Sequence, residues 1–297
     1  MAKKSSDFKG VFTALISPFV DGRVDYVSLE KLVKDQIQKG IDGFVINGTT
    51  GESPTVSTLE VSKIFETVKN LCGPQHVLIV GAGGNNTGEV VIAAKAAEKM
   101  GADAILSVVP YYNKPPQRGL VKHFTEIANN VSIPIILYNV PGRTITALSI
   151  DSIIELAKHP RIIGIKEASG DIDFAKKIST KLGNDFVLLS GDDETYSKFL
   201  EAGGHGVISV ATHVIPTEMK KIKALISSGE GAKAHELLNT YIPMIRMLFS
   251  EANPIPVKAA MKIMGYIQSA ELRLPLVEMD KALQENLHNE LKQRNMI

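Results

Sequence analysis

The chain has 297 residues, of which 44% are hydrophobic and 22% charged, a composition typical of a folded globular protein. Its 33 Lys and Arg residues nearly balance its 32 Asp and Glu residues, so no overall field would attract nucleic acid or an anionic membrane. The single cysteine, Cys72, excludes an internal disulfide and multi-cysteine metal motifs, and we expect a buried, unreactive thiol.

The N-terminal sequence "MAKKSSDFKG" is charged and polar, and no apolar stretch follows it that would serve as a signal peptide. No run of about 18 apolar residues, the length that spans a membrane, occurs in the sequence. We therefore expect a cytoplasmic protein without a membrane partner.

Short apolar, β-branched runs recur along the chain. Most are continuously apolar rather than alternating, which is typical of parallel strands that helices bury on both faces. The expected strands are Phe12–Leu15, Phe44–Asn47, Val77–Val80, Ala104–Val108, Ile135–Tyr138, Ile162–Lys166, Phe186–Leu189 and Val207–Val210.

The segments between these strands have apolar residues at helical spacing. After the second strand, Ser57 and Glu60 have the spacing of a capping box. The helix after the third strand is expected to open in the same way at Thr87 and to end at Gly101. Further helices are expected to begin near Ser28, Gly119, Ser149, Asp171, Asp193 and Pro216.

Eight strands alternating with eight helices over about 225 residues predict an α/β fold, a closed (β/α)8 TIM barrel. The competing fold is an open doubly wound sheet, which the glycine-rich turn in "VLIVGAGGNNTGE" would suit. That turn has Asn86 in place of the third glycine, and the next strand lacks a terminal acidic residue. From about residue 230 onward, the sequence has only helical patterns. We therefore expect a catalytic barrel over residues 1–229 and a C-terminal helical extension over residues 230–297.

The carboxyl ends of all strands in a parallel barrel lie at the same end of the barrel, where active sites form. Polar side chains follow most of the expected strands in this sequence. The residues that the barrel would gather there are Thr49, Thr50, Tyr111, Tyr112, Tyr138, Arg143, Lys166, Asp192 and Ser209.

Lys166 directly follows the apolar run at residues 162–165. Apolar barrel walls would desolvate its ammonium group and could lower its pKa by up to about 3–5 units in a fully buried case. A neutral lysine amine is a nucleophile that forms Schiff bases with carbonyl substrates. The alternative is a structural ion pair with Glu167 or another carboxylate.

Tyr138, Thr50 and Tyr112 supply hydroxyl groups from three strand ends, and linked hydroxyls can relay the protons that imine formation requires. Each of these residues, taken alone, also fits a packing or turn position. Arg143 follows a Pro-Gly turn that could aim its guanidinium at a substrate carboxylate, although an isolated loop arginine is usually a solvated charge.

The seven histidines form no metal-ligand spacing, and Asp192 with Asp193 fits a turn before a helix better than a cation site. We therefore expect no metal and no other cofactor.

Five motifs lie along the barrel, and a sixth lies in the helical tail. They are "GTTGES" (48–53), "YYNKP" (111–115), "YNVPGRT" (138–144), "GIKEASGD" (164–171) and "SGDD" (190–193), followed by "NPIPVK" (253–258). In their order and spacing, these motifs resemble the dihydrodipicolinate synthase family. The resemblance implies that pyruvate forms an imine with Lys166, becomes an enamine and attacks the aldehyde of L-aspartate 4-semialdehyde. The product would be 4-hydroxy-tetrahydrodipicolinate, on the route to diaminopimelate and lysine.

The resemblance also implies roles for matching residues. Tyr138 would be the central proton donor and acceptor, Thr50 would link the hydroxyl chain, and Tyr112 would complete that chain from a neighbouring subunit. Thr49 and Thr50 would hold the pyruvyl carboxylate near the Ile208 backbone, and Arg143 would bind the semialdehyde carboxylate. Members of the family are usually homotetramers built from two tight dimers.

The resemblance implies an L-lysine inhibitor site only in part, because some residues of that site match and others do not. Ser53, Asn85, Glu89 and Tyr111 match the effector pocket of lysine-sensitive relatives, whereas Thr58 and Val61 stand where those relatives commonly have histidines. Inhibition by L-lysine is left open by this difference.

Two other functions remain alternatives. One is another lyase of the superfamily that acts on a sugar acid or 2-oxo acid, such as N-acetylneuraminate lyase. The other is a non-catalytic, ligand-sensing barrel. The "PGRT" loop favours the synthase, because a guanidinium suits a small dianionic partner.

Overall fold

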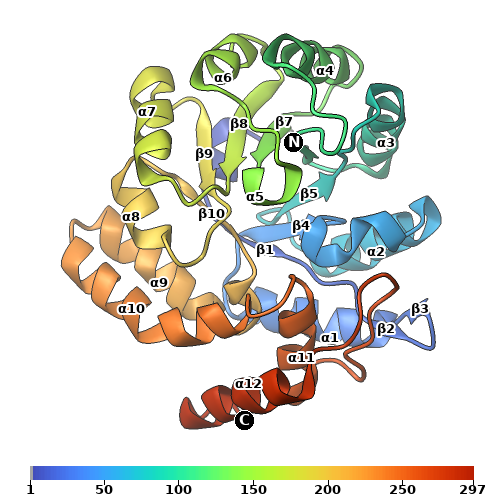
Figure 1. The fold of residues 1–297 in the computed structure, drawn as a ribbon, viewed down its shortest axis with the longest axis vertical. Coiled ribbons are helices and arrows are strands. Elements are labelled where there is room, and N and C mark those ends of the chain that lie inside the picture. Colours follow the sequence, from blue (N-terminus) through green and yellow to red (C-terminus); the bar gives the residue numbers. More distant parts are fainter. Residues whose placement is uncertain (1–2) are drawn as a thin grey trace. The chain divides into compact units, whose positions relative to one another are not determined.

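The computed structural model describes residues 3–297 of the chain. Eight strands form a closed barrel in the order β1-β10-β9-β8-β7-β6-β5-β4, and helices follow them in the sequence (Figure 1). The predicted TIM barrel is confirmed, and each expected strand lies within one residue of its observed bounds. The barrel strands are β1 (Val11–Ala14), β4 (Gly43–Ile46), β5 (Val77–Gly81), β6 (Ala104–Val108), β7 (Ile135–Asn139), β8 (Ile162–Glu167), β9 (Val187–Ser190) and β10 (Gly206–Ser209).

The chain forms two compact units, which are described separately. The first consists of Met1–Val11 and Val77–Ser209, and the second of Phe12–His76 and Val210–Ile297. The expected division into residues 1–229 and 230–297 stays a prediction.

The first unit contains the strands β5 to β10. In Figure 1 its larger helices follow one another along the outside of these strands, with α4 between α3 and α6. All five residues of β7 are buried, as expected for a strand covered on both faces. The helices of this unit are η1 (Ser5–Phe8), α3 (Thr87–Met100), α4 (Gln117–Asn129), α5 (Pro141–Thr144), α6 (Ile150–Leu156), α7 (Ile172–Leu182) and α8 (Tyr196–Glu201).

The second unit contains β4 and most of β1, together with a hairpin of β2 (Phe19–Val20) and β3 (Arg23–Val24). Its C-terminal part is helical, as predicted, and α10 packs beside α9 and α12. The helices of this unit are α1 (Tyr26–Gln38), η2 (Thr49–Gly51), η3 (Ser53–Thr55), α2 (Thr58–Leu71), η4 (Ala211–His213), α9 (Pro216–Ser227), α10 (Gly231–Met247), α11 (Ile255–Ile263) and α12 (Lys281–Gln293). None of the helices in the described part of the chain is long and apolar enough to cross a membrane.

Side-chain caps confirm the helix starts predicted at Ser149 and Asp171, whereas the helix expected near Ser28 is capped by Asp25 and begins at Tyr26. The capping box of Ser57 and Glu60 is confirmed. The expectation for Thr87 is wrong, because the Asn86 side chain caps α3 instead, by accepting a hydrogen bond from Gly88 N. Gly101 ends α3 as predicted, with φ 85°. Cys72 follows α2 and is half-buried rather than fully buried.

Candidate active site

Lys166 lies at the end of β8, and a β-bulge in that strand decides which way its side chain points. Ile135 of β7 pairs with Ile162, but the next residue of β7 pairs with Gly164, so Ile163 is an extra residue. A register shift of this kind places two residues of one strand opposite one residue of its partner. From there the register is regular, and Lys166 pairs with Tyr138.

The shared register places the side chains of Lys166 and Tyr138 on the same face of the sheet. Both residues are buried, with 7% and 8% of their surface exposed. Lys166 Nζ lies 4.3 Å from the centroid of the Tyr138 ring. Within residues 3–297, the Lys166 ammonium has no carboxylate partner. The structure therefore brings together the predicted nucleophile and the predicted proton donor.

Glu167 points to the opposite face, where it meets Asn139, its register partner on β7. Asn139 Nδ2 donates to Glu167 Oε2 over 2.7 Å, and Ser169 N donates to Glu167 Oε1 over 2.6 Å. Burial raises the pKa of the Glu167 carboxyl, although these hydrogen bonds oppose that shift. The alternative of a Lys166–Glu167 ion pair is thus wrong, because adjacent strand residues face opposite ways.

Gly191, just after β9, lies against the aliphatic part of Lys166. A Cβ atom at this position would lie 2.7 Å from Lys166 Cε and 2.5 Å from Ala168 Cβ. Real side chains do not approach this closely, so the path of the lysine side chain requires a glycine here. Gly191 lies within the motif "SGDD", but the sequence alone did not indicate this role.

Three further predicted residues of the first unit lie at the ends of their strands. Arg143 is exposed and belongs to the one-turn helix α5, which begins at Pro141 after β7. Ile208 lies in β10 and is 2% exposed. Tyr112, in the loop after β6, is 87% exposed and has φ 73°, an uncommon conformation for a bulky residue.

Thr49 and Thr50 lie in η2 of the second unit, directly after β4. Thr50 is buried, and Asn253 Nδ2 donates to its Oγ1 over 3.0 Å. Ser17 Oγ donates to the carbonyl of the next residue, Gly51, over 2.8 Å. Sequence reasoning missed Asn253, which is 203 residues from Thr50 in the chain, although it lies within a quoted motif.

Three residues of the predicted L-lysine pocket belong to the first unit, and Ser53 belongs to the second. Asn85 Nδ2 donates to the Tyr111 carbonyl over 3.2 Å, so this side chain helps to hold the loop that carries Tyr111. Glu89 is exposed in the first turn of α3.

Asp192 has the turn role that its sequence suggested. Its Oδ1 accepts hydrogen bonds from both N and Oγ1 of Thr195, each over 2.9 Å, and Thr195 precedes α8. Within residues 3–297 no group of three or more His, Cys, Asp or Glu side chains could hold a metal ion.

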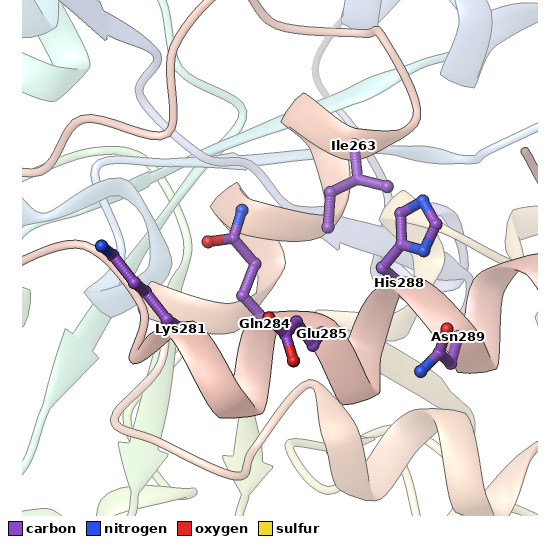
Figure 2. A pocket seen from close by; sticks show the side chains of 6 residues that line it. All are labelled: Ile263, Lys281, Gln284, Glu285, His288 and Asn289. Atoms are coloured by element: carbon purple, nitrogen blue, oxygen red, sulfur yellow. The ribbon is translucent and has the colours of Figure 1, made fainter.

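A cavity of about 590 Å³ lies between α11 and α12. Figure 2 shows its lining, in which Ile263 comes from α11 and the other side chains from α12. None of the predicted site residues lines it; the lining residues are Ile263, Lys281, Gln284, Glu285, His288 and Asn289.

Comparison with known families gives one match over almost the whole chain. The model described as the dihydrodipicolinate synthetase family matches residues 7–294. A 4-hydroxy-tetrahydrodipicolinate synthase from Bdellovibrio bacteriovorus is 54% identical over 286 residues, which are 96% of this chain and 98% of that protein.

Solved structures agree with this match. The chloride-inhibited dihydrodipicolinate synthase from Acinetobacter baumannii complexed with pyruvate is 40% identical, with a TM-score of 0.94 over 97% of this chain and 99% of that one. The enzyme from Cyanidioschyzon merolae with lysine bound is 37% identical, with a TM-score of 0.95 over 99% of this chain and 100% of that one.

Proposed function

Because the chain belongs to the dihydrodipicolinate synthetase family, we propose that it condenses pyruvate with L-aspartate 4-semialdehyde to give 4-hydroxy-tetrahydrodipicolinate. This reaction is the committed step of diaminopimelate and lysine biosynthesis, and its enzyme is a lyase. The identity of 54% to a relative of that name supports the substrates. The single structural observation that carries the proposal is the buried Lys166 side chain, whose Nζ lies against the Tyr138 ring.

The proposed reaction begins when the Lys166 amine adds to the C2 carbonyl of pyruvate and the carbinolamine loses water to form an imine. Loss of a C3 proton converts the imine to an enamine, whose carbon then attacks the semialdehyde carbonyl. The amino group of the semialdehyde next adds to the imine carbon, which closes the ring and releases the lysine. The protonated imine is the electron sink, so the proposal requires no further cofactor.

Protons must enter and leave at each of these steps. We assign the central transfer to the Tyr138 hydroxyl, since its ring already lies against the amine. Thr50 and Tyr112 complete the proposed relay, in the roles that the family resemblance implies.

Substrate carboxylates need donors of hydrogen bonds or charge. We assign the pyruvyl carboxylate to Thr49, Thr50 and the Ile208 backbone, and the semialdehyde carboxylate to Arg143. Arg143 is exposed and lies in the one-turn helix α5, which supports this assignment.

The proposal includes a homotetramer built as a dimer of dimers, in which Tyr112 serves the site of a neighbouring subunit. The 87% exposure of Tyr112 within one chain supports such a role. L-Lysine is proposed as an inhibitor that binds Ser53, Asn85, Glu89 and Tyr111, and the lysine-bound relative from Cyanidioschyzon merolae supports that assignment. A cytoplasmic location is proposed from the single cysteine.

A substrate panel tests the proposed function. The protein should consume pyruvate only when L-aspartate 4-semialdehyde is present, and it should produce the cyclic product. Cleavage of N-acetylneuraminate or of another sugar acid, with no condensation, would instead identify a lyase of the same superfamily. Binding without turnover of any of these compounds would indicate a ligand sensor.

A further inference from the structure

The segment of residues 48–53, which we call the threonine loop, makes two turns in a short distance. After η2 the chain passes through Glu52 in the left-handed region, with φ 57° and ψ 42°. This conformation is unfavourable for a residue with a side chain and persists only where the surroundings impose it. The contacts of Glu52 therefore affect where Thr49 and Thr50 lie.

Both oxygens of the Glu52 carboxylate are bound by parts of the chain more than 200 residues away in sequence. Lys258 Nζ, on α11, forms a short ion pair with Oε1, and the side chains of this pair are 0% and 1% exposed. Arg273 N donates to Oε2 over 3.0 Å. The carboxylate thus joins the threonine loop to two segments of the C-terminal helical region.

The partners of Glu52 are themselves fixed. Lys258 Nζ also donates to the Glu271 carbonyl over 2.8 Å and lies 4.0 Å from the centroid of the Phe19 ring. Burial lowers the pKa of Lys258 to about 8, although the Glu52 carboxylate opposes this shift. The pair is therefore buried among partners from several segments of the second unit.

Arg273 extends the same network to the residues that follow the threonine loop. Its Nη1 donates to the Thr55 carbonyl over 2.7 Å and to Glu60 Oε2 over 2.9 Å. Glu60 is also the residue that closes the capping box of α2. The loop is therefore held between its own helix and the C-terminal region.

Asn253 makes the direct connection to a proposed catalytic hydroxyl. The residue is buried, with 7% of its surface exposed, and its side chain donates to Thr50 Oγ1 over 3.0 Å. When the Thr50 oxygen accepts this hydrogen bond, its own proton is free to point to another acceptor. Asn253 thereby leaves the Thr50 proton available for another acceptor.

Stability alone is a weak reason for a buried ion pair. Removing two charges from water is costly, and replacing such a pair by apolar residues often leaves stability unchanged or raises it. A geometric role explains the arrangement better here, because the pair and Asn253 both act on the threonine loop.

We propose that Glu52, Lys258 and Asn253 are positioning residues, which hold Thr49 and Thr50 in the geometry needed to bind the pyruvyl carboxylate and to relay protons. This inference rests on the proposed function for its catalytic part. Its structural part, that the C-terminal helical region holds the threonine loop, does not.

The test compares Glu52→Gln/Lys258→Met with the wild type. The double variant removes the ion pair without leaving an unpaired buried charge, and Gln can still accept from Arg273 N. The control is Asp42→Asn/Lys220→Met, which removes a partly exposed ion pair of the same unit, 2.6 Å long, that lies outside the network. Asn253→Ala is the second test variant, because it removes the hydrogen bond to Thr50 and leaves the ion pair in place.

We expect both test variants to keep a pyruvate adduct on Lys166, which borohydride reduction traps, while kcat/KM falls at least tenfold. Amide hydrogen exchange in peptides that cover residues 48–53 should become faster in the double variant, and the control should match the wild type in both measurements. Wild-type kinetics and exchange in a folded double variant, or in Asn253→Ala if the double variant does not fold, would overturn the inference. If the wild type traps no pyruvate, the proposed function fails, while the exchange comparison still decides whether the network holds the loop.

Discussion

At the scale of single residues, the direction of the Lys166 side chain decides between two roles. The lysine could form an ion pair with Glu167, or its amine could react with a substrate. Residues 166 and 167 are both buried, but the strand sends them to opposite faces. The Glu167 carboxylate accepts hydrogen bonds from Asn139 and Ser169, and Lys166 Nζ lies against the Tyr138 ring instead. Among residues 3–297 no carboxylate pairs with this lysine, which makes it a candidate for the proposed chemistry.

Gly191→Ala should misplace Lys166 more than it destabilises the fold. The added methyl group would overlap Lys166 Cε and Ala168 Cβ, and overpacking of this size costs typically about 1–3 kcal/mol. We expect the rate of pyruvate trapping to fall at least tenfold, as measured by borohydride reduction and mass spectrometry.

The matched control for Gly191→Ala is Gly88→Ala in α3. There the nearest atom to the new methyl group is Asn86 Oδ1 at 3.5 Å, an ordinary contact. The control should trap pyruvate like the wild type. Trapping at the wild-type rate by Gly191→Ala would show that the lysine does not depend on this glycine.

Tyr138→Phe should separate binding from turnover. Phenylalanine keeps the ring that contacts Lys166, but it removes the hydroxyl that we assign to proton transfer. Loss of such a group lowers kcat by about 10²–10⁴. Steady-state kinetics should show this decrease while the pyruvate adduct still forms. Tyr266→Phe, which removes a hydroxyl bonded to Asp35 on α1, should keep its turnover; equal turnover in Tyr138→Phe would remove that residue from the mechanism.

At the scale of elements, the short helix η4 is joined to the segment after β1 by a buried imidazole. His213 is 0% exposed, and its Nε2 accepts a hydrogen bond from Ile16 N over 3.3 Å. Its Nδ1 lies 2.9 Å from the Val210 carbonyl, to which it donates. The ring must be neutral to make both contacts, since Nε2 is an acceptor. Burial accordingly lowers the pKa of His213 to about 4.

This neutral histidine predicts a loss of stability in acid. The unfolded chain takes up a proton near the ordinary value of 6.5, whereas the folded chain does so only near 4. The free energy of unfolding should therefore fall as the pH decreases between these values, by about 2 kcal/mol from pH 7 to pH 5.

Urea unfolding at pH 7 and pH 5 measures this effect. In His213→Gln the side chain is neutral at every pH, so its stability should change less between the two conditions. His123, whose pKa is also lowered by burial to about 4, is present in both proteins and cancels from the comparison. An equal decrease in the variant and the wild type would rule out His213 as the source.

At the scale of the whole molecule, the barrel was predictable because its strands are marked locally. Continuous apolar runs fixed each strand to within one residue, and side-chain caps such as Ser149 and Asp171 marked helix starts. Elements with a weaker sequence pattern were predicted at the wrong residue or missed. The helix expected near Asp193 begins at Tyr196, and the two-residue strands β2 and β3 were too short to give a pattern.

The candidate site was only partly predictable, for a similar reason. Lys166 and Tyr138 lie near the ends of neighbouring strands, so the predicted strand order was enough to place them near each other. Asn253 and Lys258 reach the threonine loop from more than 200 residues away, and no local pattern records such a contact. The bulge at Ile163 also left no clear signal, although it sets the face on which Lys166 lies.

The central claim is that the Lys166 amine bonds covalently to pyruvate, and trapping the imine tests it most directly. The protein is incubated with pyruvate and borohydride, and its mass and peptide map are compared with those of Lys166→Ala. We predict one reduced pyruvyl group, located on Lys166 and absent from the variant. An adduct on another residue, or none in the folded wild-type protein, would contradict the account.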